Sequence, residues 1–255
     1  MTTKRTLFTI TALCIAIFIA GFIAVGCTST PSSTNTTEVT DTAGRCVQVP
    51  NKVSKIAIVG SSARIATYAG CADKIVAVTD MDKADVARPY TIANKSIFEN
   101  LPSTNNGNHL NSTTVDEERM LQIKPDIILS SRNAEECEAL QQNTGLPVVC
   151  VYASDDLFGQ SIKNAITVCG EAAGTSEHAQ NTIDFMEKCQ RELTELSAGL
   201  SLPKLYRGAI NYKGTKGFTG TISNYSVYKY IGAINVADRD DISNGYDTTF
   251  EQILS

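Results

Sequence analysis

The sequence predicts an α/β protein with two parallel-sheet α/β lobes joined by one long helix, the C-terminal lobe incomplete. Short apolar, β-branched runs alternate with helical patterns between residues 55 and 152, and such alternation predicts a parallel sheet. A later helical pattern of about 23 residues is long enough, at roughly 35 Å, to reach from one lobe to another. Residues 202–255 then start a second lobe that is short of the ~100 residues typical of a domain, so we expect a truncated product or a fragment.

The composition is that of a mildly acidic globular protein. The chain has 255 residues, 42% of them hydrophobic, and a formal net charge of -5. An acidic chain lacks the basic footprint of a nucleic-acid binder. Two histidines are too few for a His-rich metal site, so we predict no metal ligands and no cofactor.

The first 27 residues have the layout of a lipoprotein signal peptide. Lys4 and Arg5 precede an apolar run, and small residues stand just before Cys27. This end resembles a lipobox, although Ala24 stands where Leu is commonest, and the resemblance implies that Cys27 is lipidated. The alternative is an uncleaved transmembrane anchor, since the run is long enough to span a bilayer. Residues 28–44, rich in Ser and Thr, are predicted to be a flexible tether.

Residues 45–156 are predicted to form the N-terminal lobe. Its strand-like runs are bounded by turn signals and are residues 55–59, 74–79, 126–130 and 147–152. Its predicted helices are residues 63–69, 115–123 and 134–142. The apolar runs are continuous rather than alternating, which is typical of strands buried on both faces.

Residues 157–201 are predicted to be connecting helices. Gly174 ends the first helix, Thr175 caps the second, and Pro203 stops it. The second helix carries an apolar stripe of Ala179, Ile183, Met186, Cys189, Leu193 and Leu196. In the partial C-terminal lobe we expect a strand, a Gly- and Thr-rich loop, a helix, a strand and a final helix, at residues 204–210, 212–223, 225–230, 233–237 and 250–255.

Six cysteines follow Cys27, at widely and irregularly spaced positions: Cys46, Cys71, Cys137, Cys150, Cys169 and Cys189. The absence of a CxxC pair argues against a zinc cluster. Export permits disulfides, but six cysteines allow 15 connectivities and the sequence does not choose among them. We favour buried free thiols, with disulfides as the alternative.

Several phrases along the chain resemble one known family in their order and spacing. They are VTDTAGRCVQVP at 39–50, KIAIVG at 55–60, ERMLQIKPDII at 118–128, GEAAG at 170–174, GAINVA at 232–237 and FEQIL at 250–254. Together they resemble the substrate-binding proteins of ABC importers for iron complexes, siderophores, haem and cobalamin. The resemblance implies two lobes on one rigid helix and delivery of a solute to an ABC permease with its ATPase subunits. It also implies that Glu118 and Glu251, one on each lobe, dock onto permease arginines.

The ligand is expected between the lobes, where strand ends and their loops face each other. Polar candidates on the first lobe are Ser61, Ser62, Arg64, Asn106, His109, Ser131 and Arg132. Candidates on the second lobe are Tyr212, Lys213, Thr219, Thr221 and Tyr225. Arginine and lysine suit carboxylates or phosphates of an anionic chelate, and tyrosine can stack on a planar ring.

No catalytic residues are predicted. The sequence has no GxSxG elbow and no GxGxxG or GxxxxGK[ST] phosphate loop. We therefore interpret the chain as a solute-binding lipoprotein on the outer face of the cytoplasmic membrane, carrying a small-molecule metal chelate. The alternative is a surface lipoprotein that uses the same scaffold for sensing or interaction, with transport lost. The sequence does not name the chelate.

Overall fold

The structure is a computed structural model, and it describes residues 35–83, 88–105, 114–154, 156–210, 214, 216–242 and 245–254. The chain divides into two units, Met1–Asn35 and Thr36–Ser255. The signal segment and Cys27 lie outside the described residues, and everything below concerns the second unit. Within the described part of the chain, no helix has both the length and the apolar character needed to cross a membrane.

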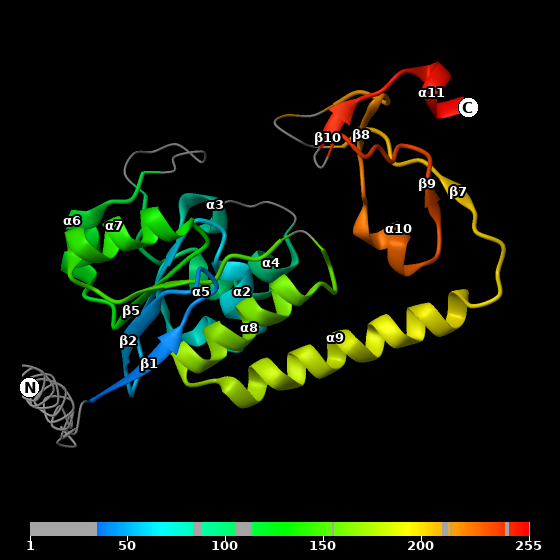
Figure 1. Cartoon of the computed structure of the whole chain (residues 1–255). Coiled ribbons are helices and arrows are strands. Elements are labelled where there is room, and N and C mark those ends of the chain that lie inside the picture. Colours follow the sequence, from blue (N-terminus) through cyan, green and yellow to red (C-terminus); the bar gives the residue numbers. More distant parts are fainter. Residues whose placement is uncertain are drawn as a thin grey trace, which may run out of the picture. The chain divides into compact units, whose positions relative to one another are not determined.

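A four-stranded parallel sheet forms the centre of the first lobe. Its strands are β3 (Ile56–Val59), β4 (Ile75–Ala77), β5 (Ile127–Ser130) and β6 (Val148–Cys150), in the order β4-β3-β5-β6 (Figure 1). All three pairings are parallel, which confirms the predicted sheet. From β3 the chain runs to β4 on one side and then returns to β5 on the other. The strand order therefore reverses between β3 and β5.

Both faces of this sheet are covered, as the continuous apolar runs predict. Ile56 and Ile58 of β3 belong to one hydrophobic cluster, whereas Ala57 and Val59 belong to a second one. This alternation is the two-residue period of a strand. The helices of the lobe are α2 (Ala63–Tyr68), the 3-10 turn η1 (Ala72–Lys74), α3 (Asp80–Lys83), α4 (Pro89–Ala93), α5 (Lys95–Phe98), α6 (Glu117–Ile123), α7 (Ala134–Thr144) and α8 (Gln160–Ala173).

An antiparallel hairpin precedes the sheet, formed by β1 (Thr36–Thr40) and β2 (Cys46–Pro50). The expected tether at 28–44 is therefore wrong from Thr36 onward, because its threonines are β-branched and suit a strand. Between the strands, the buried Asp41 accepts a hydrogen bond from Cys150 N at 3.1 Å. Arg45 forms ion pairs with Asp41 at 3.1 Å and with Glu138 at 3.2 Å. The phrase at residues 39–50 that resembles the family therefore has a structural role in this hairpin.

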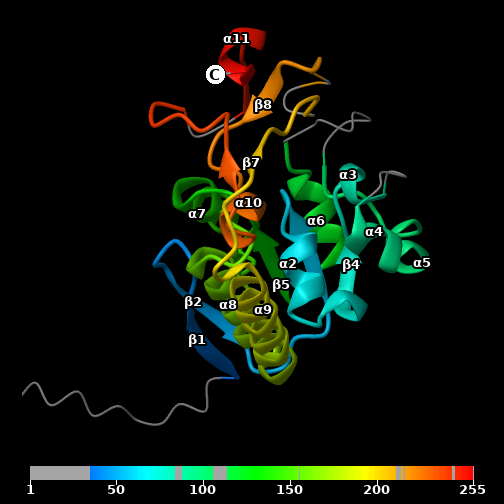
Figure 2. The same ribbon diagram turned by 90° about the vertical axis from the view of Figure 1, so that its right-hand side faces the viewer.

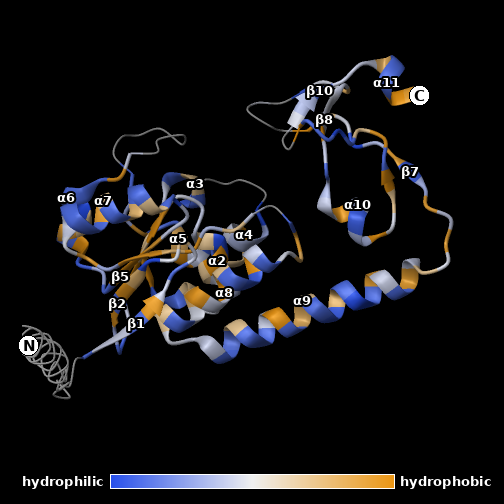
Figure 3. Ribbon diagram, in the orientation of Figure 1, coloured by the Kyte–Doolittle hydropathy of each residue, from blue (hydrophilic) through white to orange (hydrophobic). Residues whose placement is uncertain are grey.

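The long connecting helix is α9 (Ser176–Ser197), which has 22 residues and lies beside α8 (Figure 2). Thr175 occupies its N-cap position, but the side chain makes no capping hydrogen bond, contrary to the prediction. The helix also ends six residues before Pro203. Figure 3 shows mixed hydropathy along α9, and the expected stripe is only partly buried: Ala179 is 1% exposed and Leu196 is 76% exposed.

The residues after α9 form small elements. They are β7 (Lys204–Leu205), β8 (Gly220–Ile222), α10 (Ser226–Tyr230), β9 (Ile234–Asn235), β10 (Gly245–Asp247) and α11 (Phe250–Leu254). The parallel pair β7–β9 agrees with the predicted α/β pattern. The strand predicted at 204–210 is only two residues long, and the segment predicted as a loop contains β8, which pairs with the unpredicted β10.

Candidate ligand-binding site

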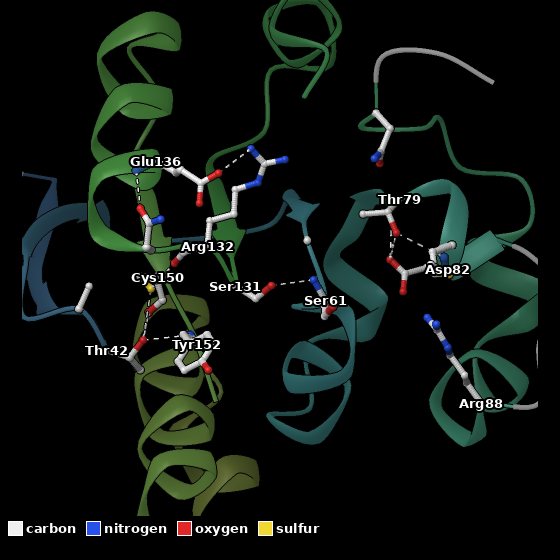
Figure 4. Close-up of a pocket in the computed structure, with 15 residues that line it drawn as sticks. Thr42, Ser61, Thr79, Asp82, Arg88, Ser131, Arg132, Glu136, Cys150 and Tyr152 are labelled. Atoms are coloured by element: carbon white, nitrogen blue, oxygen red, sulfur yellow. Dashed lines mark hydrogen bonds and ion pairs between the residues drawn. The ribbon is translucent and has the colours of Figure 1, made fainter. Parts of the chain in front are cut away.

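A cavity of about 720 Å³ lies at the carboxyl edge of the parallel sheet (Figure 4). The residues that follow each of the four strands contribute to its wall. The lining residues are Thr42, Ala43, Gly60, Ser61, Thr79, Met81, Asp82, Arg88, Asn105, Ser131, Arg132, Asn133, Glu136, Cys150 and Tyr152. Because ligands of open α/β sheets bind outside the carboxyl ends of the strands, this is the position where a site is expected.

The centre of the cavity wall lies where the strand order reverses. Ser61 follows β3 and Ser131 follows β5, and the Ser61 N–H donates to Ser131 Oγ at 2.7 Å. Gly60 makes the turn with φ of +69°, and a Cβ at this position would overlap Ser131 Oγ. A glycine is therefore required both by the left-handed backbone and by the close approach of the two loops.

A second cavity of about 680 Å³ adjoins the first. Ser61, Arg88, Ser131 and Tyr152 line both cavities, so the two form one continuous hollow along the sheet edge. The second cavity adds side chains from α2 and α4, namely Arg64, Ile65, Tyr68, Pro89 and Tyr90. The site therefore offers aromatic surface as well as polar groups.

Three arginines reach this hollow from three different segments. Arg132 forms an ion pair with Glu136 at 3.6 Å. Arg88 Nη1 donates to the neutral Tyr90 hydroxyl at 3.3 Å. Arg64 has no hydrogen bond or ion pair to another residue in the described part of the chain. Of these three arginines, Arg64 and Arg88 thus have no carboxylate of the described residues within ion-pair distance, which favours an anionic ligand.

The carboxylate of Asp82, which also lines the hollow, already accepts hydrogen bonds from the chain itself. Asp82 is 2% exposed, and its carboxylate accepts hydrogen bonds from the hydroxyls of Thr79 at 2.7 Å and Tyr90 at 2.9 Å. Burial raises the pKa of Asp82 above 3.8 despite these bonds. Burial and the charge of Asp82 raise the pKa of Tyr90 to about 12. Tyr90 therefore stays protonated and keeps its hydrogen bond to Asp82, whose nearly buried carboxylate forms part of the wall of the first cavity.

The described residues contain no group of three or more His, Cys, Asp or Glu side chains that could hold a metal ion. The hollow presents guanidinium groups, hydroxyls and aromatic rings, together with the carboxylates of Asp82 and Glu136. The guanidinium groups, hydroxyls and rings contact the organic part of a ligand rather than coordinating a bare cation.

The predicted ligand-binding residues fall into four groups. Ser61, Ser131 and Arg132 line the first cavity and Arg64 lines the second. Ser62 does not take part: it is fully buried, and its Oγ lies at 2.8 Å from the Leu129 carbonyl. Outside the described residues lie Asn106, His109, Tyr212 and Lys213.

The three remaining candidates belong to the C-terminal segment and line neither of these cavities. Thr221 is buried on β8, and Thr219 stands next to that strand. The Tyr225 ring lies under the Arg207 guanidinium, 4.1 Å from its carbon to the ring centroid. Tyr225 is therefore engaged with a cation of the chain itself.

Several lining residues were not predicted. Thr79 and Tyr152 follow the strands β4 and β6 closely, just as Ser61 and Ser131 follow β3 and β5, so strand position was a usable signal for them. Arg88 and Asp82 flank a segment between helices, and Thr42 comes from the hairpin. No local pattern marks these three, because only the tertiary fold brings them to the sheet edge.

Comparison with known proteins identifies the family. The family model described as "Periplasmic binding protein" matches residues 56–224, and the chain belongs to this family. The resemblance found in the sequence is thereby confirmed. No curated protein matches the chain.

Solved structures share the fold. A periplasmic solute-binding protein from Veillonella parvula is 22% identical with a TM-score of 0.63, covering 86% of this chain and 65% of its own. The molybdate-binding protein MolA of Haemophilus influenzae is 17% identical with a TM-score of 0.64, at 86% and 71% coverage. The vitamin B12-binding protein BtuF of Vibrio cholerae is 19% identical with a TM-score of 0.54, at 79% and 72%. The chain thus spans about two thirds of the length of these proteins.

Proposed function

We propose that this protein captures an anionic metal chelate outside the cytoplasm and delivers it to an ABC permease with its ATPase subunits. The chelate is an iron complex, either a siderophore or haem, or a corrinoid. The observation that carries the proposal is the hollow at the strand-order reversal, with Arg64 and Arg88 directed to it from α2 and the start of α4. Capture by burial needs no bond to form or break, which agrees with a family of binding proteins.

The size of the hollow supports a chelate. Pockets for organic ligands span roughly 300–1,000 Å³, and the two adjoining cavities measure about 720 and 680 Å³. An inorganic oxyanion would fill only a small part of that space. It remains the second candidate because a structural neighbour binds molybdate and because arginines suit oxyanions.

We further propose how the protein is held and how it docks. Lipidation of Cys27 would anchor the chain to the outer face of the membrane, with stable binding requiring more than one acyl chain. Glu118 on α6 and Glu251 on α11 are both exposed, as permease docking requires. Paired carboxylates that meet cations set register and encounter rate more than affinity.

A thermal-shift panel tests the proposed ligand class. The chain has no tryptophan, so unfolding of the purified full chain in detergent would be followed with a dye or by circular dichroism. Ferric siderophores, haem, cobalamin and molybdate would each be added in excess. A ligand at about 100 times its Kd stabilises the fold by roughly 2.7 kcal/mol, which raises Tm by several degrees.

We expect one chelate to raise Tm and molybdate to leave it unchanged. A Tm shift with molybdate alone would indicate that the ligand is an oxyanion and not a chelate. No shift with any compound would contradict solute capture and favour the alternative, a surface lipoprotein used for sensing or interaction.

A further inference from the structure

Two cysteines far apart in the sequence face each other in the first lobe. Cys71 Sγ and Cys169 Sγ lie 3.8 Å apart, although the residues are separated by 98 positions. Cys71 follows α2 at the start of η1, and Cys169 lies in the middle of α8. The contact therefore joins two segments that only the tertiary fold brings together.

The surroundings fix this geometry. Both cysteines are fully buried within the larger hydrophobic cluster. The Cys71 N–H donates to the Ala66 carbonyl at 3.0 Å, which holds the turn after α2. Lys74 Nζ donates to the Ala173 carbonyl at 2.7 Å and ties η1 to the end of α8. The two sulfurs thus face each other because their backbones are held, and they are well placed to react.

Buried cysteines often serve only as small apolar side chains. Here two of them meet sulfur to sulfur, and the family acts outside the cytoplasm, where disulfides can form and persist. A disulfide needs an S–S distance of about 2.05 Å, so the sulfurs must approach by less than about 2 Å. We propose that Cys71 and Cys169 form a disulfide in the exported chain. The proposal rests on export and is independent of the ligand.

The reaction is a thiol–disulfide exchange with an extracytoplasmic disulfide oxidant, either an oxidoreductase or a small-molecule disulfide. One cysteine, as thiolate, attacks the oxidant and releases one of its sulfurs as a thiol, leaving a mixed disulfide. The other cysteine then attacks the mixed disulfide and releases the second sulfur. Two protons and two electrons pass from the chain to the oxidant. Because the pair is buried, this must happen during folding or local opening.

The other cysteines provide contrast. Cys46 is exposed on β2 and Cys189 is half-buried on α9. Cys137 and Cys150 also hydrogen-bond to each other through their sulfurs, but both sulfurs bond to the Arg132 carbonyl as well, at 3.6 and 3.1 Å, and Cys150 lines the ligand cavity. A structural crosslink away from the site is thus assigned to Cys71 and Cys169, which line neither ligand cavity.

Peptide mapping of the full chain tests the assignment without any mutation. Protein collected from the extracytoplasmic side without reductant would be denatured in an alkylating reagent, digested and analysed by mass spectrometry. We expect one crosslinked species containing Cys71 and Cys169, which separates into two peptides after reduction. Alkylation of both cysteines before reduction would overturn the proposal.

A stability measurement gives an independent test. The disulfide would close a loop of about 100 residues. Its reduction should therefore lower Tm by roughly 10 °C. We expect this reductant effect in the wild type and in Cys46→Ala, and its loss in Cys71→Ala. A reductant effect of equal size in Cys71→Ala would contradict the pairing, whatever the stability of that variant.

Discussion

Asp126 shows how one side chain joins two strands of the sheet. Its Oδ2 accepts hydrogen bonds from the Ser54 N–H at 2.7 Å, the Ser54 hydroxyl at 2.9 Å and the Lys55 N–H at 2.8 Å. Burial by itself would raise the pKa of Asp126, but these hydrogen bonds outweigh it and bring the pKa below 3.8. The carboxylate therefore fixes the start of β3 beside the start of β5, next to the sheet that carries the site.

This lowered pKa predicts how stability depends on pH. A group whose pKa is lower in the folded state contributes stability above its unfolded pKa, near 3.9, and loses it as pH falls through the folded value. We expect Asp126→Asn to reduce the free energy of unfolding by about 1 kcal/mol at pH 7, allowing for solvent screening. Urea unfolding at pH 7 and pH 3 should show this difference shrinking in acid.

The matched control is Asp73→Asn, an exposed acid in η1, which should have no effect at either pH. A difference between wild type and Asp126→Asn that is as large at pH 3 as at pH 7 would show that the charge of Asp126 is not what stabilises the fold.

Ser61 and Ser62 show that the sequence does not predict the direction of single side chains. Ser61 and Ser62 both follow β3, and both were predicted to contact ligand. The turn at Gly60 leaves Ser61 exposed at the cavity, whereas Ser62 points inward against Leu129. Position after a strand was predictable, but the direction of each side chain depends on turn dihedrals that the sequence does not specify.

At the scale of elements, the β3–α2 turn brings two loops together at the site. Gly60 has φ of +69°, and Gly145, at the end of α7, has φ of +67° with open space where a Cβ would stand. Alanine at either position carries the left-handed backbone cost of about 1–2 kcal/mol. Only at Gly60 does the added methyl also displace Ser131, which holds the Ser61 N–H.

We therefore expect Gly60→Ala to destabilise the protein by about 1 kcal/mol more than Gly145→Ala and to weaken ligand binding at least about tenfold. Denaturant unfolding and ligand titration of both variants measure the two effects. Equal stability and equal binding in the two variants would mean that the Ser131 contact has no role.

Elements that are buried on both faces were predictable, and those with little core were not. The strands β3, β5 and β6 lie within apolar runs that admit few other structures. By contrast β10 has the sequence Gly-Tyr-Asp, and β7 pairs over only two residues. Their pairing comes from the tertiary fold, because neither has a periodic apolar pattern.

For the molecule as a whole, the docking proposal predicts a separation of binding from transport. Glu118→Ala combined with Glu251→Ala should leave the ligand Kd unchanged, since neither residue lines the cavities, while lowering uptake by at least about tenfold. Transport into permease-containing vesicles or cells measures this. Glu135→Ala, an exposed acid in the first turn of α7, is the control. Uptake unchanged in the double variant would contradict docking through these acids.

The family could be identified from sequence, but the composition of the site only in part. Ser61, Arg64, Ser131 and Arg132 were predicted from their positions after strands, whereas Arg88 was not. Arg88 is the N-cap residue of α4, between β4 and β5, and no local signal in the sequence marks it as part of the hollow. Short motifs in a fixed order along the chain identify the family. The ligand depends on side chains that several separate segments bring together.

The most direct test of solute capture is a titration of the chelate that shifts Tm in the panel, measured on wild type and on Arg64→Ala combined with Arg88→Ala. A hydrogen bond to a charged group contributes about 1.5–3 kcal/mol, so losing both should raise Kd by roughly 100-fold or more. Arg191→Ala, an exposed arginine on α9, should match wild type. An unchanged Kd in the double variant would contradict an anionic ligand held in this hollow.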